Sequence, residues 1–528
     1  MKNKAFHATR LLLLTFLFVS VGMPLLTLLM NIQIEDIAGI VNAPQFGPMV
    51  KNSLIATSIA TCISVVLAWA LAWCVNRTNI KYKNVLSVLF TIPMLIPSIS
   101  HGMGLVLLFG DNGLVTNLLG INIGLYGYKG IVMGSVLYSF PVAFLMLTDV
   151  FQYEDYTIYE AANVLGLNKK QQFLKITIPN MKKSLISVIF SVFTMIFTDY
   201  GVPLTVGGKI LTIPVYMYRE VIGLLDFSKG AIIGVLLLIP AVLAFVIDLK
   251  SDENSNESTV TKQFIVEPNK VRDRLAYVFC SVAIVLMSFP LMAFAYLSVV
   301  KQYPIDMALS MDNILQAFEL GVGNYLLNSL TIALLSSIVG LVVIYATAYV
   351  TARSKKTFSS MALHLISMIS LAIPGIVLGL SYVLFFKSSW IYGTLIILVL
   401  VNMIHFFASP YLIAYNSLSK FNDKLEDVAA VMGVSRWRML LDVYVPCTME
   451  SMVEMFSYLF VNSMVTISAV SFLANFKNMP IALMIPQFDA QSLIEATAFI
   501  SILIFVVNAA MKCGVYLVKK YIQRQEIV

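Results

Sequence analysis

The sequence predicts an all-α polytopic membrane protein with about 12 transmembrane helices, arranged as two parallel six-helix halves. Three observations support this prediction. Hydrophobic residues make up 59% of the 528-residue chain and charged residues only 12%, with a mean hydropathy of +0.86, which is outside the range of soluble globular domains. Long apolar windows recur along the chain, and a polar segment of the first half reappears in the second half at a constant shift.

Twelve apolar windows are long enough to cross the roughly 30 Å of membrane hydrocarbon, which takes about 20 helical residues. The first window follows the basic segment MKNKAFHATR. It is full length and no small-x-small cleavage site follows it, so we expect an uncleaved helix. The windows lie at residues 11–30, 53–74, 85–109, 130–150, 184–204, 229–248, 275–299, 329–350, 360–386, 391–414, 452–474 and 493–514.

Lysine and arginine are unevenly distributed between alternate loops. If the N-terminus lies inside, the inner segments hold 27 of the 35 basic residues. Cytoplasmic loops of membrane proteins carry this excess of positive charge. We therefore expect a multi-pass protein of the plasma (cytoplasmic or inner) membrane with both termini in the cytoplasm.

A polar segment divides the chain into two comparable parts. Residues 251–274 are rich in serine, asparagine and charge, which predicts a flexible cytoplasmic linker between a first half, 1–250, and a second half, 275–528. Six windows return each half to the side where it began, so the repeat must be parallel rather than inverted. Short repeats agree: NSL at 52–54 and 328–330, IPSISHG at 96–102 and IPGIVLG at 373–379, and FP at 140–141 and SP at 409–410.

One polar loop is repeated more clearly than any other segment. YEAANVLGLNKKQQFLKITIP, residues 159–179, aligns without a gap with EDVAAVMGVSRWRMLLDVYVP, residues 426–446, at a shift of 267. The two copies lie in the loops 152–183 and 417–450, each before the fifth window of its half.

Local signals in both loops predict a helix, a turn and a second helix. Thr157 and Glu160 have the spacing of a capping box, and Asp423 and Glu426 are the counterparts in the second half. Gly166 and Gly433 suit a left-handed position after the first helix, and Asn168 and Ser435 suit the N-caps of the second. Helices of about two turns are marginal alone in water, so we expect each to dock against a partner. The alternative is that the loops only cover the end of the bundle.

The first loop resembles the EAA loop of permease subunits in ABC-type importers. That pattern is E-A-A, three residues, Gly, nine residues and Ile-x-x-Pro, and it is matched at Glu160, Ala161, Ala162, Gly166, Ile176 and Pro179. The second copy has Asp427, Val428 and Ala429 in place of E-A-A and Val443 in place of Ile, while it keeps Gly433 and Pro446. The resemblance covers nearly the whole chain, as two fused permease domains of the binding-protein-dependent type I importer fold.

The resemblance implies that each loop forms a coupling helix docked on one of two cytoplasmic ABC ATPase subunits. The ATPase-coupling residues would be Glu160, Ala161, Ala162, Gly166, Pro179, Asp427, Ala429, Gly433 and Pro446. It also implies an extracytoplasmic solute-binding protein as a partner. No Walker A sequence occurs in the chain, so we expect no enzyme and no directly bound cofactor, with ATP held by the partner subunits. Five cysteines without CxxC spacing and histidines that occur singly predict no catalytic residue and no metal site.

Prolines interrupt corresponding windows of the two halves. Pro97 and Pro374 break the third and ninth windows, and irregular backbone at membrane depth commonly borders a substrate path, although ordinary kinked packing is the alternative. His101 lies beside the first break. Asp199, in FTDYGVPLTVGG at 197–208, has the uncharged counterpart Thr466. A carboxylate at this depth should line water or a partner, or cap broken backbone.

The sequence leaves the cargo and one rival class open. TDYGVPLTVGG resembles permeases for 2-aminoethylphosphonate and for ferric iron, and thiamine and polyamine permeases remain alternatives. Asp199 favours an amine or a metal cation, whereas Lys209 and Arg219 favour an anion. The rival class is a 6+6 secondary transporter of the major-facilitator type, which does not explain two EAA-like loops. A channel is a further alternative, without a filter-like sequence to support it.

Overall fold

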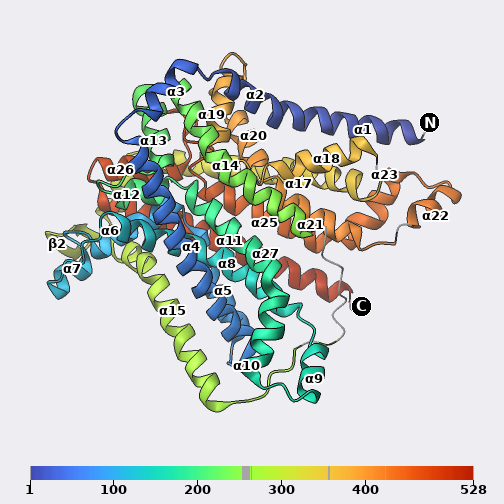
Figure 1. Ribbon diagram of the computed structural model, residues 1–528. Coiled ribbons are helices and arrows are strands. Elements are labelled where there is room, and N and C mark those ends of the chain that lie inside the picture. Colours follow the sequence, from blue (N-terminus) through green and yellow to red (C-terminus); the bar gives the residue numbers. More distant parts are fainter. Residues whose placement is uncertain (1, 253–261, 263, 355–356, 423, 527–528) are drawn as a thin grey trace.

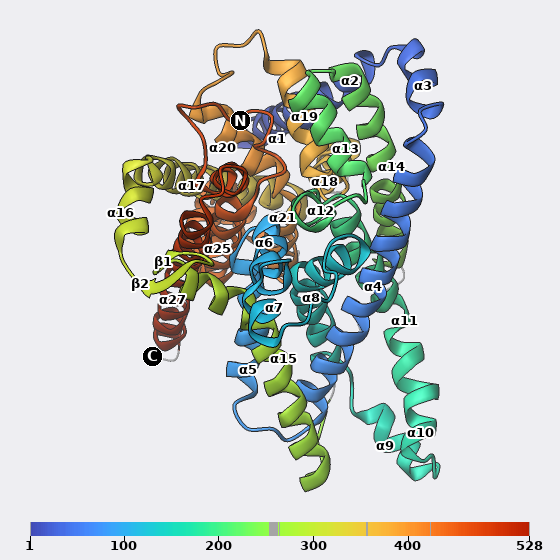
Figure 2. The same ribbon diagram turned by 90° about the vertical axis from the view of Figure 1, so that its left-hand side faces the viewer.

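The protein is a bundle of long helices that diverge toward one end (Figures 1 and 2). The computed structural model describes residues 2–252, 262, 264–354, 357–422 and 424–526. Asp423, the predicted capping residue of the second loop, therefore lies outside the described residues. Two short antiparallel strands, β1 (Val300–Gln302) and β2 (Asp306–Leu309), form the sheet within the described part of the chain.

The first half of the chain runs from α1 to α14. Its helices, including 3-10 and π-helical turns labelled η, are α1 Lys2–Leu17, η1 Phe18–Gly22, α2 Met23–Met30, α3 Ile34–Val41, α4 Phe46–Arg77, α5 Lys83–Thr91, η2 Ile92–Leu95, α6 Ser98–Phe109, α7 Leu114–Leu119, α8 Tyr128–Gln152, α9 Thr157–Val164, α10 Lys169–Gln172, η3 Phe173–Thr177, α11 Ile178–Phe197, α12 Gly201–Val206, α13 Ile213–Tyr218, η4 Arg219–Gly223 and α14 Phe227–Asp252.

The second half runs from α15 to α27, and α15 begins within the segment assigned to the linker. Its helices are α15 Lys270–Leu297, α16 Asp312–Glu319, α17 Val322–Ala352, α18 Phe358–Ile369, α19 Gly375–Phe386, α20 Leu395–His405, α21 Ala408–Ser419, α22 Leu425–Val431, α23 Arg436–Met439, η5 Leu440–Tyr444, α24 Val445–Cys447, α25 Met449–Val465, η6 Ile481–Leu483, α26 Met484–Ala490 and α27 Ile494–Glu526.

The spans are fewer than the apolar windows predict. Among the described residues, nine helices are long and apolar enough to cross a membrane, and α20 with α21 forms a tenth span bent by 53°. Window 360–386 is divided into α18 and α19 of 12 residues each, and window 452–474 holds α25, which ends at Val465 after 17 residues. Window 184–204 also extends too far, because α11 ends at Phe197. Hydropathy detects apolar residues, but it does not detect where the backbone leaves the helix.

Proline starts a new helix at both predicted interruptions. Pro97 is the N-cap residue of α6 and Pro374 that of α19, with φ −58° at both and ψ of 152° and 139°. The residue before a proline is driven to an extended conformation, and Ile96 accordingly has φ −123° and ψ 153°. The backbone therefore breaks in the same way at corresponding positions of the two halves.

Other helices provide partners for the backbone groups released by the first break. The Nε2 atom of His101 lies 3.0 Å from the carbonyl oxygen of Pro93. The side-chain amide of Asn508, on α27, donates to the carbonyl of Leu95 at 3.0 Å. His101 is thus engaged with the protein itself, 2% exposed, as expected for a residue inside the bundle.

Glycines allow a second irregular segment to pack against each broken helix. A Cβ atom on Gly102 would lie 3.2 Å from the carbonyl oxygen of Val202, and one on Gly379 would lie 2.6 Å from that of Ala469. Gly102 and Gly379 are partners in the repeated IPSISHG and IPGIVLG sequences, and Val202 and Ala469 are 267 residues apart. Segments 198–212 and 466–480 thus fill corresponding places in the two halves.

The first helix of each half packs on the other half. α1 lies beside α18 and α17, and α2 packs on α19 (Figure 1). Conversely, α15 packs against α6, α4 and α5. The Tyr382 hydroxyl of α19 donates to the carbonyl of Ser20 at 2.8 Å, which joins the second half to the π-helical turn in the first span. The two halves are therefore interlocked.

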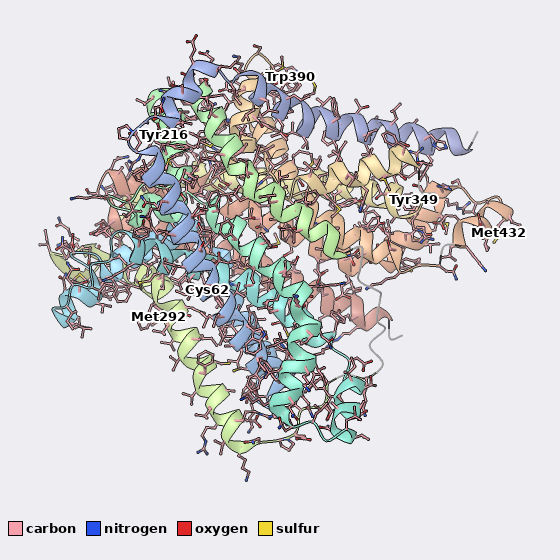
Figure 3. All side chains as sticks on the ribbon, in the orientation of Figure 1. Cys62, Tyr216, Met292, Tyr349, Trp390 and Met432 are labelled. Carbon is pink, nitrogen blue, oxygen red and sulfur yellow. The ribbon has the colours of Figure 1, made fainter. Side chains whose placement is uncertain are left out.

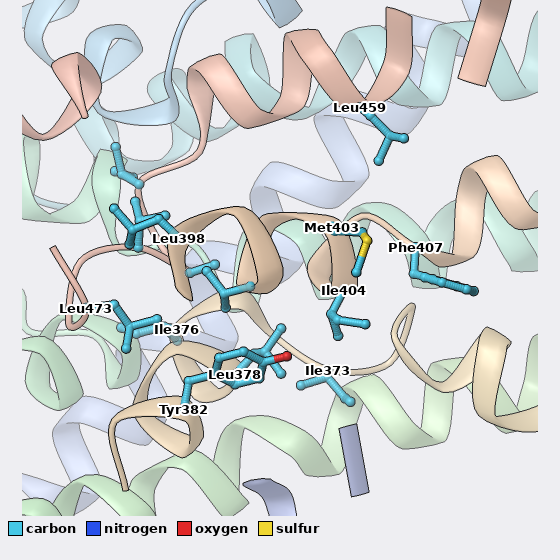
Figure 4. Close-up of a cluster of buried hydrophobic side chains, with 14 of the residues drawn as sticks. Ile373, Ile376, Leu378, Tyr382, Leu398, Met403, Ile404, Phe407, Leu459 and Leu473 are labelled. Carbon is cyan, nitrogen blue, oxygen red and sulfur yellow. The ribbon is translucent and has the colours of Figure 1, made fainter. Parts of the chain in front are cut away.

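The core of the second half is built around α19 and α20. Ile376, Leu398, Ile404 and Tyr382 are fully buried and converge between these helices and their neighbours (Figure 4). In a membrane such packing is stabilised by van der Waals contact between the side chains, because lipid is as apolar as they are. This packing fixes α19 and hence the break at Pro374.

Gly379→Val should destabilise the protein. The added side chain meets backbone at 2.6 Å, and overpacking of this kind costs about 1–3 kcal/mol. We expect the Tm in detergent to fall by several degrees. Gly514→Val is the matched control, because Gly514 lies in α27 with no atom within 4 Å of its Cβ position. Equal Tm values for the two variants would refute the close contact.

Candidate functional site

The two repeated loops fold as a short helix, a tight turn and a second helix. The first is α9 followed by α10 and η3, and the second is α22 followed by α23 and η5. Gly166 and Gly433 sit at the turns with φ of +71° and +73°, and no atom lies within 4 Å of either Cβ position. Glycine is needed at these turns for its backbone conformation and not for space.

The caps of the second helices are as predicted. The Asn168 side chain accepts from the backbone N–H of Gln171 at 2.9 Å, and the Ser435 hydroxyl accepts from that of Arg438 at 3.2 Å. The helix begins at Thr157 as predicted, but the predicted capping box is wrong: Asp155, two residues before the helix, accepts from the N–H of Thr157 at 3.0 Å.

The residues predicted to couple to an ATPase lie mainly on the surface of the loops. Ala162 is buried, Glu160 and Ala429 are partly buried, and the others are exposed: Ala161, Gly166, Pro179, Asp427, Gly433 and Pro446. Beside them, both loops expose an apolar pair at equivalent positions, Val164 with Leu165 and Val431 with Met432, each at least 73% exposed. Figure 3 shows Met432 at the tip of its loop, far from the rest of the bundle.

A buried ion pair anchors the second loop to the end of α17. The Nε and Nη2 atoms of Arg353 donate to the two carboxylate oxygens of Glu426, on α22, at 2.7 and 2.6 Å. The Tyr444 hydroxyl donates to the same carboxylate at 2.6 Å. Burial raises the pKa of the Glu426 carboxyl, but the hydrogen bonds from Arg353 and Tyr444 outweigh it and hold that pKa below its ordinary value. The carboxylate is therefore charged at neutral pH, in a bidentate pair of the strong kind.

The same three side-chain types anchor the first loop to the end of α4. Arg77, the last residue of α4, pairs with Glu154, and both side chains are 7% exposed. The Tyr159 hydroxyl of α9 donates to Glu154 and lies 2.7 Å from the hydroxyl of Thr177. We call these two arginine–glutamate–tyrosine groups the latches.

Both latches consist of the same three residue types, but their glutamate and tyrosine do not occupy corresponding positions in the two halves. Arg77 and Arg353 are 276 residues apart, the same shift that separates the two NSL segments. By the 267 shift of the loops, however, Tyr159 corresponds to Glu426 and Thr177 to Tyr444. Sequence analysis did not identify the latches for this reason. The available signal was an arginine at the same end of two long apolar helices.

Part of the segment between the halves packs on the first loop. Lys262 pairs with Glu160 at 2.5 Å, and its carbonyl accepts from the N–H of Tyr156 at 3.0 Å. The ring of Phe264 lies 3.6 Å from the Arg77 guanidinium carbon and 5.1 Å from the ring of Tyr159. The predicted coupling residue Glu160 is thus engaged within the chain.

The two halves meet at a seam that contains corresponding residues. The Tyr200 hydroxyl lies 2.5 Å from that of Ser471 and 3.5 Å from the carbonyl of Ile467, which is 267 residues away. A residue and its own repeat partner are thus in contact at this seam. The ring of Tyr200 also stacks on Tyr218 at 4.7 Å. We call this contact between segments 198–212 and 466–480 the central seam.

Asp199 caps backbone beside the seam. Its carboxylate accepts from the N–H groups of Gly201 at 3.3 Å and Val202 at 2.9 Å, at the start of α12. The adjoining cavity measures about 10 Å³, room for one water molecule. Four residues were predicted to border the substrate path. Asp199 and Pro97 lie near this seam in the first half, and Pro374 lies in the second half. The fourth, His101, contacts the carbonyl oxygen of Pro93.

The described residues hold no group of three His, Cys, Asp or Glu side chains placed to bind a metal ion. Among them, the Nδ1 atom of His405 has no hydrogen-bond partner, whereas that of His364 lies 2.5 Å from the Tyr411 hydroxyl.

A family model matches both halves of the chain. The family of binding-protein-dependent transport system inner membrane components matches residues 60–249 and again 345–524. Together the two matches cover well over half of the sequence.

Two relatives are named for ferric transport. A provisionally named ferric transport system permease protein of Haemophilus influenzae is 26% identical over 72% of this chain and 63% of its own length. The ferric transport system permease protein of Actinobacillus pleuropneumoniae is 25% identical over 72% of this chain and 58% of its own length. The chain therefore spans about three fifths of the length of these two relatives. Among solved structures, a bacterial alginate ABC transporter is similar at 16% identity and a TM-score of 0.37, over 50% of this chain and 97% of the other.

Replacements of Asp199 should separate its capping role from its charge. The two N–H groups bind different carboxylate oxygens, so Asn, with one acceptor oxygen, keeps one of these bonds and Ala keeps neither, and loss of a cap costs about 1 kcal/mol. We therefore expect Asp199→Ala to lower the Tm in detergent more than Asp199→Asn does. If Asn lowered the Tm as much as Ala, the negative charge itself would be required and the capping role would be refuted.

Proposed function

Since the chain belongs to the family of binding-protein-dependent transport system inner membrane components, we propose that it is the permease of an ATP-driven importer. In this proposal two separate ABC ATPase subunits dock on the two repeated loops, and an extracytoplasmic solute-binding protein delivers the cargo. ATP binding draws the loops together, and the permease alternates between inward-open and outward-open states.

The pair of matched loops supports this proposal most strongly. Both present an exposed apolar pair, Val164 with Leu165 and Val431 with Met432, on a short helix. Exposed apolar pairs gain free energy when a partner covers them, at about 25 cal/mol per Å². Both loops are also held by a buried arginine–glutamate pair, so a force on the loop reaches the bundle. Two docking sites of one design suit two ATPase subunits.

The charge distribution supports the orientation of the proposed complex. With both termini in the cytoplasm, the loops that hold Glu160 and Glu426 face the cytoplasmic ATPases, and 27 of 35 basic residues lie on the same side. The opposite end, with β1, β2, α7 and α16, would then meet the solute-binding protein (Figure 2).

Ferric iron is the cargo we propose to test first, because two relatives are named for ferric transport. 2-Aminoethylphosphonate is the second candidate, on the strength of the TDYGVPLTVGG stretch. Asp199 is occupied by backbone N–H groups, so its charge does not select between a cation and a phosphonate. Thiamine and polyamines are the remaining alternatives.

The rival proposal is a secondary transporter with two parallel six-helix halves. It gives no role to two loops with matched turns at Gly166 and Gly433. A direct experiment separates the classes: uptake of radioactive ferric iron or 2-aminoethylphosphonate is measured in cells that carry the chain. We expect uptake to stop when ATP is depleted and the ion gradient is held. Uptake that continues under these conditions would refute the importer, as would purification without any P-loop ATPase after gentle detergent extraction.

Replacing both turn glycines by valine should uncouple ATP hydrolysis from transport. A β-branched residue is strained at φ of +71° and +73°, so the turns would change shape although no atom obstructs the new side chain. We expect Gly166→Val/Gly433→Val to insert in the membrane and to hydrolyse ATP with its partners while uptake is lost. Gly514→Val is the control at an ordinary helical position. Normal coupled transport by the double variant would contradict docking through these turns.

A further inference from the structure

The repeated NSL segments bind the backbone that leads away from the central seam. The Ser53 hydroxyl accepts from the N–H of Ile213 at 2.8 Å, and the Ser329 hydroxyl accepts from that of Ile481 at 2.8 Å. Ile213 is the first residue of α13 and Ile481 the first of η6. Ser53 and Ser329 are each 2% exposed, so both bonds are shielded from water.

The neighbouring asparagines strengthen the same attachment. The Asn52 side-chain amide donates to the carbonyl of Leu211 at 3.2 Å. The Asn328 amide donates to the carbonyls of Lys477 at 3.1 Å and Met479 at 3.3 Å. In each half the bound backbone directly continues one of the seam segments, 198–212 and 466–480. Residues from both halves thus hold the seam by the same chemistry.

The attached serines and the latches lie at opposite ends of the same helices. Ser53 and Arg77 both belong to α4, and Ser329 belongs to α17, which Arg353 ends. At 1.5 Å per residue, about 36 Å of helix separates the two points in each half. No proline interrupts either stretch, whereas α8, α14 and α15 contain an internal proline. α4 and α17 are therefore continuous connections from loop to seam.

We propose that α4 and α17 act as two rods that carry the movement of the docked loops to the central seam. This proposal rests on the proposed function and assigns its internal mechanics. Arg77 and Arg353 are positioning residues that join each loop to its rod, and Ser53 and Ser329 are positioning residues that join each rod to the seam. A shift of α9 or α22 moves the whole helix, because the latch and the serine bond leave neither end free.

The chemistry of the latches suits a rigid joint. Arg353 also donates to the carbonyls of Phe421 and Asn422, both at 2.8 Å, so one guanidinium holds the start of α22 from two sides. A planar, multiply bonded guanidinium fixes orientation as well as distance. In the first half the Phe264 ring covers the Arg77 guanidinium. A surface ion pair without these partners would fix neither distance nor orientation.

The test measures cargo moved per ATP hydrolysed in proteoliposomes that hold the chain with its ATPases and binding protein. The probe is radioactive ferric iron. Arg353→Met/Glu426→Met removes the latch without leaving an unpaired buried charge. We expect this ratio to fall about fivefold or more, the lower end of typical coupling between distant sites. Ser329→Ala should lower the ratio as well.

The combination of the two changes gives the decisive result. If the latch and the Ser329 bond act in series, breaking either one already interrupts the connection. The variant that combines the latch change with Ser329→Ala should therefore move no less cargo per ATP than the worse of the two variants alone. Ratios that multiply would show independent effects and refute the rod. Arg353→Lys keeps the charge but loses the planar fork, so we expect an intermediate ratio. If the Arg353→Met/Glu426→Met variant does not insert in the membrane, Arg353→Lys tests the latch in its place.

Two controls separate a rod from a static brace. Thr331→Val lies two residues from Ser329, but the Thr331 hydroxyl bonds only within its own helix, to the carbonyl of Leu327 at 2.8 Å. Lys519→Met removes ion pairs with Glu450 and Glu454, both on α25, and Lys519 belongs to neither latch. Both should keep the wild-type ratio. A brace would show a lower Tm with an unchanged ratio in the latch variants, and that result would refute the proposal. Absence of ATP-dependent uptake of both ferric iron and 2-aminoethylphosphonate by the wild-type complex would instead refute the proposed function.

Discussion

Backbone that leaves the helix inside a membrane must find its hydrogen-bond partners within the protein, and most of this architecture answers that requirement. The break at Pro97 is closed by His101 and by Asn508 of the other half, and the shortened helix α11 is followed by a segment capped by Asp199. Glycines at 102 and 379 let the irregular segments approach the broken helices to carbonyl contact. Hydrogen bonds between the two halves therefore form at the segments where the backbone leaves the helix.

The two halves show which properties of the repeat depend on residue identity and which depend on geometry alone. The turns need glycine, since φ is near +70° at both, and glycine stands at both. The latches need an arginine, a carboxylate and a phenol in contact, and the positions that supply the last two differ between halves. The same three side-chain types meet in both halves although their positions differ, so the interaction itself is what the two halves share. The latch, rather than the loop sequence alone, therefore connects each loop to the bundle.

Sequence reasoning succeeded where a local rule governs the structure. The helical membrane class and the resemblance to importer permeases were confirmed by the family matches over both halves. Turns at Gly166 and Gly433 followed from backbone conformation, and the breaks followed from proline. The ends of α11 and α25 were missed because hydropathy continues past Phe197 and Val465. The partner of Arg77 was missed because Glu154 is remote in sequence and has no counterpart at the shift of the loops.

The exchange of first helices has a consequence for assembly. α1 packs on α17 and α18, and α15 packs on α4, α5 and α6, in the manner of a domain-swapped dimer made from one polypeptide. The surfaces that α1, α2 and α15 cover on the other half stay uncovered until both halves have been inserted. The connection between α14 and α15 fixes the ratio of the two halves at one to one, and the contacts exchanged between the halves form only after both have been inserted.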